Sequence, residues 1–162
     1  MRIGLGYDIH RLVDGRPFVL GGVTVPHDKG PLGHSDGDAL LHAVADALLG
    51  AAGLGDIGSH FPDTEAAFKD ADSTTLLRET VRLVRDRGYR IVNIDTNILA
   101  QAPKLSPYRE AMCATIAEAC GIDATQVSVK MRTGEGLDAV GRGEAVSTQA
   151  IVLLKTATLG DS

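Results

Sequence analysis

Tryptophan is absent from this sequence of 162 residues, and phenylalanine and tyrosine occur only three times each. A core with so few aromatic side chains has to be built largely from aliphatic residues and alanine. Basic residues are also in the minority, with 16 Lys and Arg against 21 Asp and Glu and a net charge of -5. Non-specific binding to nucleic acid or to an anionic membrane requires a basic surface. We therefore expect neither partner, and an anionic ligand has to be bound by local groups.

Cysteine occurs only twice, and long apolar runs do not occur. Cys113 and Cys120 lie about 10.5 Å apart along the axis of a predicted helix, which is too far for a disulfide. We expect buried free thiols, which suit a reducing compartment. No run of about 18 apolar residues is present to span a bilayer, and the N-terminus lacks the apolar region of a signal peptide. The protein is expected to be soluble and cytoplasmic, or plastid-located if a transit peptide has been removed.

Several catalytic motifs are missing as well. There is no G-x-S-x-G elbow, no phosphate-binding lysine motif and no set of four cysteines. The stretch GLGDIG at 53–58 matches the dinucleotide pattern G-x-G-x-x-G, but that pattern works after a strand and here it follows a predicted helix. A helix cap and turn is the simpler interpretation, and a backbone-lined ligand loop stays open. A site in this chain therefore has to be built from carboxylates and imidazoles.

The order of apolar patterns predicts an α+β fold in a single domain over residues 1–162. We expect a mixed four-stranded sheet, helices on one face of it, and a small N-terminal hairpin. The strands are expected at about 3–10, 89–101, 126–133 and 144–155, the hairpin at 18–25, and the helices at about 36–52, 73–87 and 106–120. Ser35 or Asp36 is the expected N-cap of the first helix, and Ser106 with Pro107 is expected to begin the third.

Two segments place potential metal ligands on ordered elements. The period of two in the first strand puts Asp8 and His10 on one face, opposite the apolar residues. In the first helix Asp38, His42 and Asp46 form one stripe, so carboxylates one turn from His42 could orient its second ring nitrogen. Two histidines and one carboxylate leave the fourth position of zinc open for a substrate. A narrow solvated helix face, or a buried and satisfied His42, is the alternative.

Three loops supply further candidates, each with a structural alternative. His34 and Ser35 precede a helix, where free N–H groups favour a phosphate, although Ser35 could simply cap the helix. The segment 61–65 could bind hydroxyl groups or be an acidic turn. Thr133 and Glu135 follow a strand among glycines, where a carboxylate either ligates a phosphate-bridging Mg²⁺ or is a solvated turn residue.

Taken together, the motifs DIH, HSDGDALLHA, LGDIG, FPDT, AQAPKL and GRGE resemble the 2-C-methyl-D-erythritol 2,4-cyclodiphosphate synthase family of the non-mevalonate isoprenoid pathway. The resemblance runs from Arg2 to about Leu154. It implies a homotrimer of α+β subunits, similar to the trimeric chorismate mutase architecture, with active sites between neighbouring subunits. It also implies a reaction in which the 2-phosphate of a CDP-linked substrate attacks the β-phosphorus and expels CMP.

The resemblance assigns roles to individual residues. Asp8, His10 and His42 match the zinc ligands, and Glu135 matches the ligand of a second divalent cation, Mg²⁺ or Mn²⁺. His34 and Thr133 match the residues that stabilise the transition state. The residues that match substrate contacts are Asp8, His10, His34, Ser35, Asp56, Ile57, Gly58, Phe61, Pro62, Asp63, Thr64, Glu65, Ala100, Gln101, Ala102, Pro103, Lys104, Leu105, Ser106, Arg132, Thr133, Gly134, Glu135, Ala139 and Arg142. An acidic protein can then bind a phosphorylated substrate because each carboxylate site holds a dication.

The chain departs from the family pattern around the second metal. The family carries T-T-T-E and G-F-T-G-R, where this chain reads RTGE at 132–135 and DAVGR at 138–142. Arg132 could replace a hydroxyl with a stronger charge-assisted donor, whereas Ala139 cannot cover a ligand as a phenylalanine would. Arg142 and Glu144 match residues near the threefold axis, or form an ordinary ion pair. Two other functions stay open: a phosphoesterase whose 132–140 loop admits water, and a non-catalytic trimeric zinc protein that binds isoprenoid phosphates.

Overall fold

The computed structural model describes residues 1–33, 35–62 and 72–158 and confirms a fold with both helices and a mixed sheet. The strands are β1 Arg2–Asp14, β2 Phe18–Leu20, β3 Val23–Val25, β4 Lys29–Pro31, β5 Tyr89–Leu99, β6 Val127–Arg132 and β7 Ala145–Thr156. The α-helices are α1 Ala39–Ala52, α2 Ile57–His60, α3 Ser73–Asp86, α4 Arg109–Cys120 and α5 Asp138–Gly141, with 3₁₀ turns at Ser106–Tyr108 and Ala124–Gln126.

The main sheet has five strands in the order β4-β1-β7-β5-β6, so the prediction of four strands is wrong. β7 pairs antiparallel with both β1 and β5, while β5 and β6 are parallel. The additional strand β4 pairs with the end of β1 through residues 29–31, and its sequence KGP contains no residue that favours strands. Its edge position tolerates the proline. The predicted hairpin is confirmed as the separate β2-β3 sheet.

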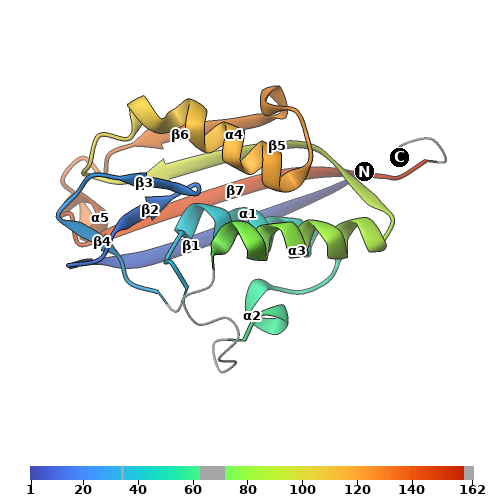
Figure 1. Ribbon diagram of the computed structural model, residues 1–162, viewed down its shortest axis with the longest axis horizontal. Helices are drawn as coiled ribbons and strands as arrows, with labels where there is room; N and C mark the ends of the chain where they lie inside the picture. The colour runs from blue at the N-terminus through green and yellow to red at the C-terminus, as the bar shows by residue number, and fades with distance from the viewer. Residues whose placement is uncertain (34, 63–71, 159–162) are drawn as a thin grey trace.

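Helices α1, α3 and α4 lie along one face of the sheet (Figure 1). α1 rests directly on β1, because a Cβ atom at Gly4 or Gly6 would lie only 1.9 Å from a backbone oxygen of the helix. The face of β1 that carries glycine, Asp8 and His10 is therefore the one that the helix covers. The largest fully buried side chains are one Phe, one Met, and otherwise Leu and Ile, which confirms a largely aliphatic core.

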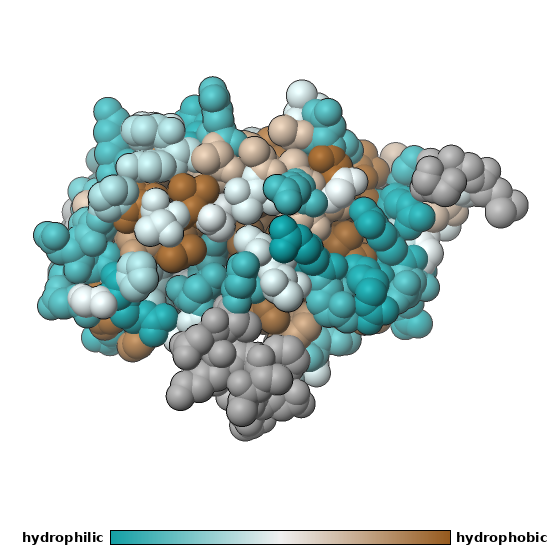
Figure 2. Space-filling model, in the orientation of Figure 1, coloured by the Kyte–Doolittle hydropathy of each residue, from teal (hydrophilic) through white to brown (hydrophobic). Residues whose placement is uncertain are grey.

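The opposite face of β1 and β7 exposes its apolar residues. Side chains on this face that are about half exposed or more are Ile3 (74%), Leu5 (67%), Tyr7 (54%), Ile9 (46%) and Ile151 (50%). On the helix-covered side, apolar residues surface only as separate patches among polar ones (Figure 2). A continuous apolar strip of this kind is typical of a surface that binds another protein chain.

Some helix boundaries differ from those expected. α1 begins at Ala39 and its N-cap is Asp38, not Ser35 or Asp36, because Asp36 directs its carboxylate to the amide groups of Asp38 and Ser73 instead. A 3₁₀ turn over Ser106–Tyr108 precedes α4, so Ser106 is not a helix N-cap. Gly53 ends α1 in the left-handed conformation, which confirms the predicted helix cap at the start of GLGDIG, whereas Ile57 and Gly58 already belong to α2.

The two cysteines are free, as predicted. Cys120 is buried, and burial raises the pKa of its thiol to about 12, whereas Cys113 is only half-buried. Within the described ranges 1–33, 35–62 and 72–158, none of the helices has the length and apolar character needed to span a lipid bilayer.

Candidate active site

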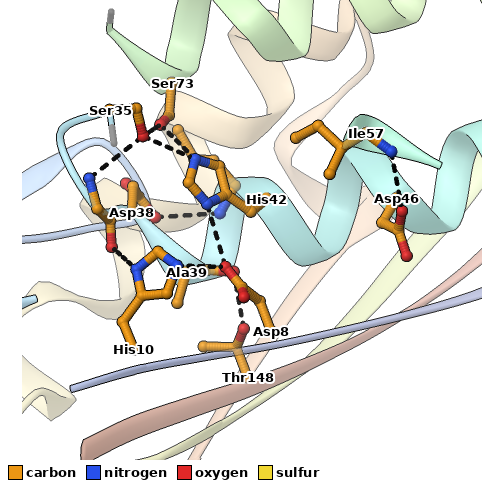
Figure 3. A network of polar contacts seen from close by, with 12 residues as sticks. Asp8, His10, Ser35, Asp38, Ala39, His42, Asp46, Ile57, Ser73 and Thr148 are labelled. Atoms are coloured by element: carbon orange, nitrogen blue, oxygen red, sulfur yellow. Dashed lines mark hydrogen bonds and ion pairs between the residues drawn. The ribbon is translucent and has the colours of Figure 1, made fainter. Parts of the chain in front are cut away.

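Three of the predicted metal ligands meet at one point of the fold. Asp8 Oδ2 lies 3.1 Å from His10 Nε2 and 3.1 Å from His42 Nδ1, and the two imidazole rings are 5.4 Å apart between centroids. Asp8 and His10 come from β1 and His42 from α1, and the three side chains point toward one another (Figure 3). The potential ligand atoms all lie within 4.8 Å of one another, and among the residues that the structure describes no other group forms such a cluster.

The local fold explains this convergence. Residues 8 and 10 share the helix-facing side of β1 because side chains alternate along a strand. The glycines at 4 and 6 allow α1 to approach the strand so closely that His42, one turn into the helix, reaches the same point. The side chains of Asp8, His10 and His42 are 24%, 15% and 15% exposed, so the cluster is mostly shielded but open on one side.

The outer nitrogen of each imidazole is already hydrogen-bonded. His10 Nδ1 lies 2.8 Å from the carbonyl oxygen of Gly37, which can only accept, so this nitrogen carries the proton. His42 Nε2 lies 3.0 Å from the hydroxyl oxygens of Ser35 and Ser73. When each neutral ring bears its proton on the outer nitrogen, two inner lone pairs face the same carboxylate oxygen. Three acceptors without a hydrogen between them need a positive partner, and two imidazoles with one carboxylate match the ligands of zinc.

The pKa values of Asp8 and His10 depend on the same contacts. Burial alone would raise the pKa of Asp8, but when the rings also carry protons on their inner nitrogens, hydrogen bonds from His10 and His42 outweigh burial and lower the pKa well below its ordinary value. Burial would likewise lower the pKa of His10, but the hydrogen bond and the charge of Asp8 raise it. The site therefore holds an ionised carboxylate that favours a positive partner, either a proton or a metal ion.

The prediction that Asp38 or Asp46, on the same stripe of α1 as His42, orients the second ring nitrogen of His42 is wrong. Asp38 is fully buried and accepts hydrogen bonds from the amides of Gly21, Gly22 and Leu41. Asp46 accepts from the amide of Ile57 at 3.1 Å and lies away from His42 (Figure 3). Neither carboxylate orients His42, because each is hydrogen-bonded to backbone amides instead. Asp38 bonds to the turn of the β2-β3 hairpin and to its own helix, and Asp46 bonds to the first residue of α2. Ser73, which sequence reasoning missed, occupies the position expected for a carboxylate.

A cavity of about 540 Å³ opens beside the metal-ligand cluster. It brings together several predicted substrate residues, since its lining includes Ser35, Asp56, Ile57, Gly58 and Phe61. Asp56 also begins α2, where its side chain accepts from the amide of Ser59. Tyr7, Gly33 and Leu76 line the cavity too and were not expected there. The predicted site residues His34, Asp63, Thr64 and Glu65 lie outside the described residues.

A second cavity, of about 260 Å³, lies where β5 and β6 end. Its lining combines the predicted segment at 100–106 with the predicted loop at 132–133, and Met131 is an unexpected addition. The two cavities have no lining residue in common. Pro62, Ala102, Gly134, Glu135, Ala139 and Arg142 line neither of them. Most of the predicted site residues that the structure describes therefore lie at two separate cavities, not at one.

At the edge of the second cavity, Thr133 and Glu135 are hydrogen-bonded to each other. Thr133 Oγ1 donates to Glu135 Oε1 at 2.7 Å, and the Glu135 backbone has a φ of 51°, unusual for a residue with a side chain. A Cβ atom at Gly134 would lie 2.5 Å from the amide nitrogen of Gly141, so the threonine of the family pattern does not fit this backbone. Arg142 forms an exposed ion pair with Glu144, at 3.0 Å between Nε and Oε1.

Comparison with known proteins identifies similar chains. Residues 1–155 match the YgbB family. The chain is 61% identical over 154 residues to the 2-C-methyl-D-erythritol 2,4-cyclodiphosphate synthase of Desulfosudis oleivorans, covering 95% of this chain and 92% of that protein. Identity to the synthase of Chromobacterium violaceum is 60% over 156 residues, covering 96% and 99%.

Solved structures of synthases from this group of relatives also superimpose on the chain. A CDP-bound 2C-methyl-D-erythritol-2,4-cyclodiphosphate synthase superimposes with a TM-score of 0.88 and 42% identity, covering 95% of this chain and 100% of that one. The CDP complex of IspF from Plasmodium falciparum gives 0.84 and 37%, covering 97% of each chain.

Proposed function

The chain belongs to the YgbB family, and we propose that it catalyses the reaction for which its relatives are named, the formation of 2-C-methyl-D-erythritol 2,4-cyclodiphosphate. The observation that carries this proposal is the Asp8, His10 and His42 cluster beside a cavity large enough for a phosphorylated sugar alcohol. The substrate is 4-diphosphocytidyl-2-C-methyl-D-erythritol 2-phosphate, and CMP is the second product.

The reaction needs positioning more than acid–base chemistry. An oxygen of the 2-phosphate forms a bond to the β-phosphorus, and the bond from that phosphorus to the oxygen bridging it to the α-phosphate breaks, so that CMP leaves with the bridging oxygen. A phosphate is already an anionic nucleophile near neutral pH, which suits a site without a Ser–His–Asp arrangement. The main obstacle is repulsion between phosphates, and bound divalent cations supply Lewis acids that neutralise their charge.

We assign the metal-binding and catalytic roles as follows. Asp8, His10 and His42 hold zinc, with the open side of the cluster facing the first cavity. Glu135 holds a second divalent cation, Mg²⁺ or Mn²⁺, which suits an exposed hard oxygen ligand. His34 and Thr133 donate hydrogen bonds where negative charge develops in the transition state.

The two cavities divide the substrate between them. Ser35, the residues at 56–58 and those at 61–65 contact the methylerythritol phosphate, and the 100–106 segment receives the cytosine. Arg132, Gly134, Ala139 and Arg142 complete the contacts around the phosphates. A CDP-bound relative with the same fold supports a nucleotide site in this chain.

A homotrimer accounts for the separation of the two cavities. We propose a trimer like that of chorismate mutase, in which the first cavity of one subunit faces the second cavity of its neighbour. The exposed apolar strip on β1 and β7 supports this assembly, because Tyr7 belongs both to that strip and to the lining of the first cavity. The free thiols suit the reducing cytoplasm.

Product analysis tests the proposed activity. The purified protein is incubated with the CDP-linked substrate, zinc and Mg²⁺, and the products are separated and identified by ³¹P NMR. We expect CMP and the cyclic diphosphate in equal amounts. Open-chain phosphates would indicate a phosphoesterase, and tight ligand binding without CMP release at any divalent cation concentration would indicate a non-catalytic zinc protein. Either result would reject the proposal.

A further inference from the structure

The carboxylate of Asp36 joins the loop before α1 to the first turn of α3. Its Oδ2 accepts a hydrogen bond from the backbone amide of Ser73 at 3.1 Å, and its Oδ1 accepts from the amide of Asp38 at 3.1 Å. The hydroxyl of Ser73 also donates to Oδ1, in a short hydrogen bond. Because the first amides of a helix have no partner within it, Asp36 satisfies one of them from a distant part of the chain.

The hydrogen bonds of Ser73 determine how it meets His42. A serine hydroxyl has a single hydrogen, and that of Ser73 is directed to the carboxylate of Asp36, which can only accept. Toward His42 Nε2, 3.0 Å away, the Ser73 oxygen can therefore only accept. Nε2 must then carry the proton of the neutral ring, and the lone pair is left on Nδ1, the nitrogen that faces Asp8.

Ser35 is also near this nitrogen but does not impose the same choice. Its hydroxyl oxygen lies 3.0 Å from His42 Nε2 and accepts from the amide of Gly37. Its contact with the Asp36 carboxylate is 3.5 Å, at the limit for a hydrogen bond, so its hydrogen is not committed to that oxygen. Ser35 can donate or accept, whereas Ser73 can only accept.

We propose that Asp36 and Ser73 act as a positioning pair, which fixes the tautomer of the neutral His42 ring so that the Nδ1 lone pair is presented to the metal. This inference rests on the proposed zinc site and concerns neither the substrate nor the reaction. Ser73 is 1% exposed and comes from α3, so the pair also fixes the orientation of the ring relative to a third element of the fold. Outer partners of metal-bound histidines typically change metal affinity by about 10- to 100-fold when they are removed.

Zinc affinity, measured without substrate, tests the pair. Competition with a chromogenic chelator is carried out on the wild type, on Ser73→Ala and on Asp36→Ala. We expect both variants to bind zinc at least about tenfold more weakly, because each frees the imidazole to protonate Nδ1. In the zinc-loaded wild type the Nε2 proton of His42 should be visible by ¹⁵N-edited NMR, and in Ser73→Ala it should exchange faster with water.

Asp72→Ala is the matched control. Asp72 is the N-cap of α3 and accepts from the amide of Thr74 at 2.8 Å, but no hydrogen bond connects it to His42. It should lower the melting temperature and leave zinc affinity within about threefold of the wild type. Wild-type zinc affinity in Ser73→Ala, or an equal loss in Asp72→Ala, would overturn the positioning role.

The inference and the proposed function fail in different ways. A wild-type protein that releases no CMP, while Ser73→Ala still weakens zinc binding, would reject the activity and retain the pair. A wild-type protein that produces the cyclic diphosphate, while Ser73→Ala binds zinc normally, would retain the activity and reject the pair.

Discussion

The two halves of the proposed site are built in contrasting ways. At the first cavity, Asp8, His10 and His42 are mostly shielded and are held by a strand and a helix that pack closely together. At the second, Thr133 in the lining and Glu135 just outside it are exposed and bond mainly to each other. The first half is organised within one chain. The second half presents its groups outward, so we infer that a neighbouring chain is needed to complete the site.

The largest effect is expected from His42→Ala, which removes a metal ligand from the first half of the site. Loss of one of three ligands should abolish stoichiometric zinc binding. Metal ions supply several kcal/mol of transition-state stabilisation, so CMP release should fall by about 1000-fold or more. Metal analysis and a CMP-release assay on the same preparation measure both effects. Normal turnover in this variant would contradict the metal centre.

Glu135→Gln should affect only the second half of the site. The amide keeps a similar shape but loses the charge that binds the second cation, and CMP release should fall by about 100-fold. Zinc content should stay at the wild-type level, which distinguishes this variant from His42→Ala. Unchanged activity over a titration of Mg²⁺ and Mn²⁺ would remove Glu135 from the metal-binding role.

Leu5→Asp is designed to weaken the proposed contact between subunits, so that the first half of the site on one chain no longer meets the second half on its neighbour. Leu5 is 67% exposed in the single chain, so the charge costs little in a monomer but would be buried without a partner in a trimer. Sedimentation velocity should show predominantly monomers, and CMP release should fall by about tenfold or more while the protein remains folded by circular dichroism. A stable trimer with normal activity would show that this face is not the interface.

A smaller effect is expected from Gly6→Ala, which disturbs the contact between β1 and α1. The added methyl group would lie 1.9 Å from the carbonyl oxygen of Ala43, and overpacking of this kind costs about 1–3 kcal/mol. Gly50→Ala is the control, because nothing lies within 4 Å of a Cβ there and alanine favours a helix by about 1 kcal/mol. Thermal unfolding should show a lower melting temperature for the first variant and a higher one for the second. Equal melting temperatures would contradict the close packing of strand and helix.

The parts of the site that the sequence predicted are those with strong local periodicity. Alternation along β1 was sufficient to place Asp8 and His10 on one face, and the helical pattern placed His42 on a rigid element. The family motifs then predicted the segment at 100–106, which lines the second cavity apart from Ala102.

What the sequence did not predict depends on contacts between distant residues. Ser73 approaches His42 from 31 positions away, and no local signal marks it. Asp36 and Asp38 are equally good N-caps by residue type, but Asp38 accepts from the amide of Leu41 in the helix while Asp36 accepts from the amides of Asp38 and Ser73. β4 was missed because its pairing with β1, not its composition, makes it a strand.

Co-expression of His42→Ala and Glu135→Gln tests the central claim, that one active site takes its two halves from different subunits. Each variant alone should retain about 1% of wild-type CMP release or less. With random assembly, half of the subunits carry an intact first half and half carry an intact second half, so about one quarter of the sites should be complete. We predict recovery of about one quarter of wild-type CMP release in the whole co-expressed population, which corresponds to about one third in the trimers that contain both subunits. Absence of recovery, in trimers shown to contain both subunits, would contradict a shared site.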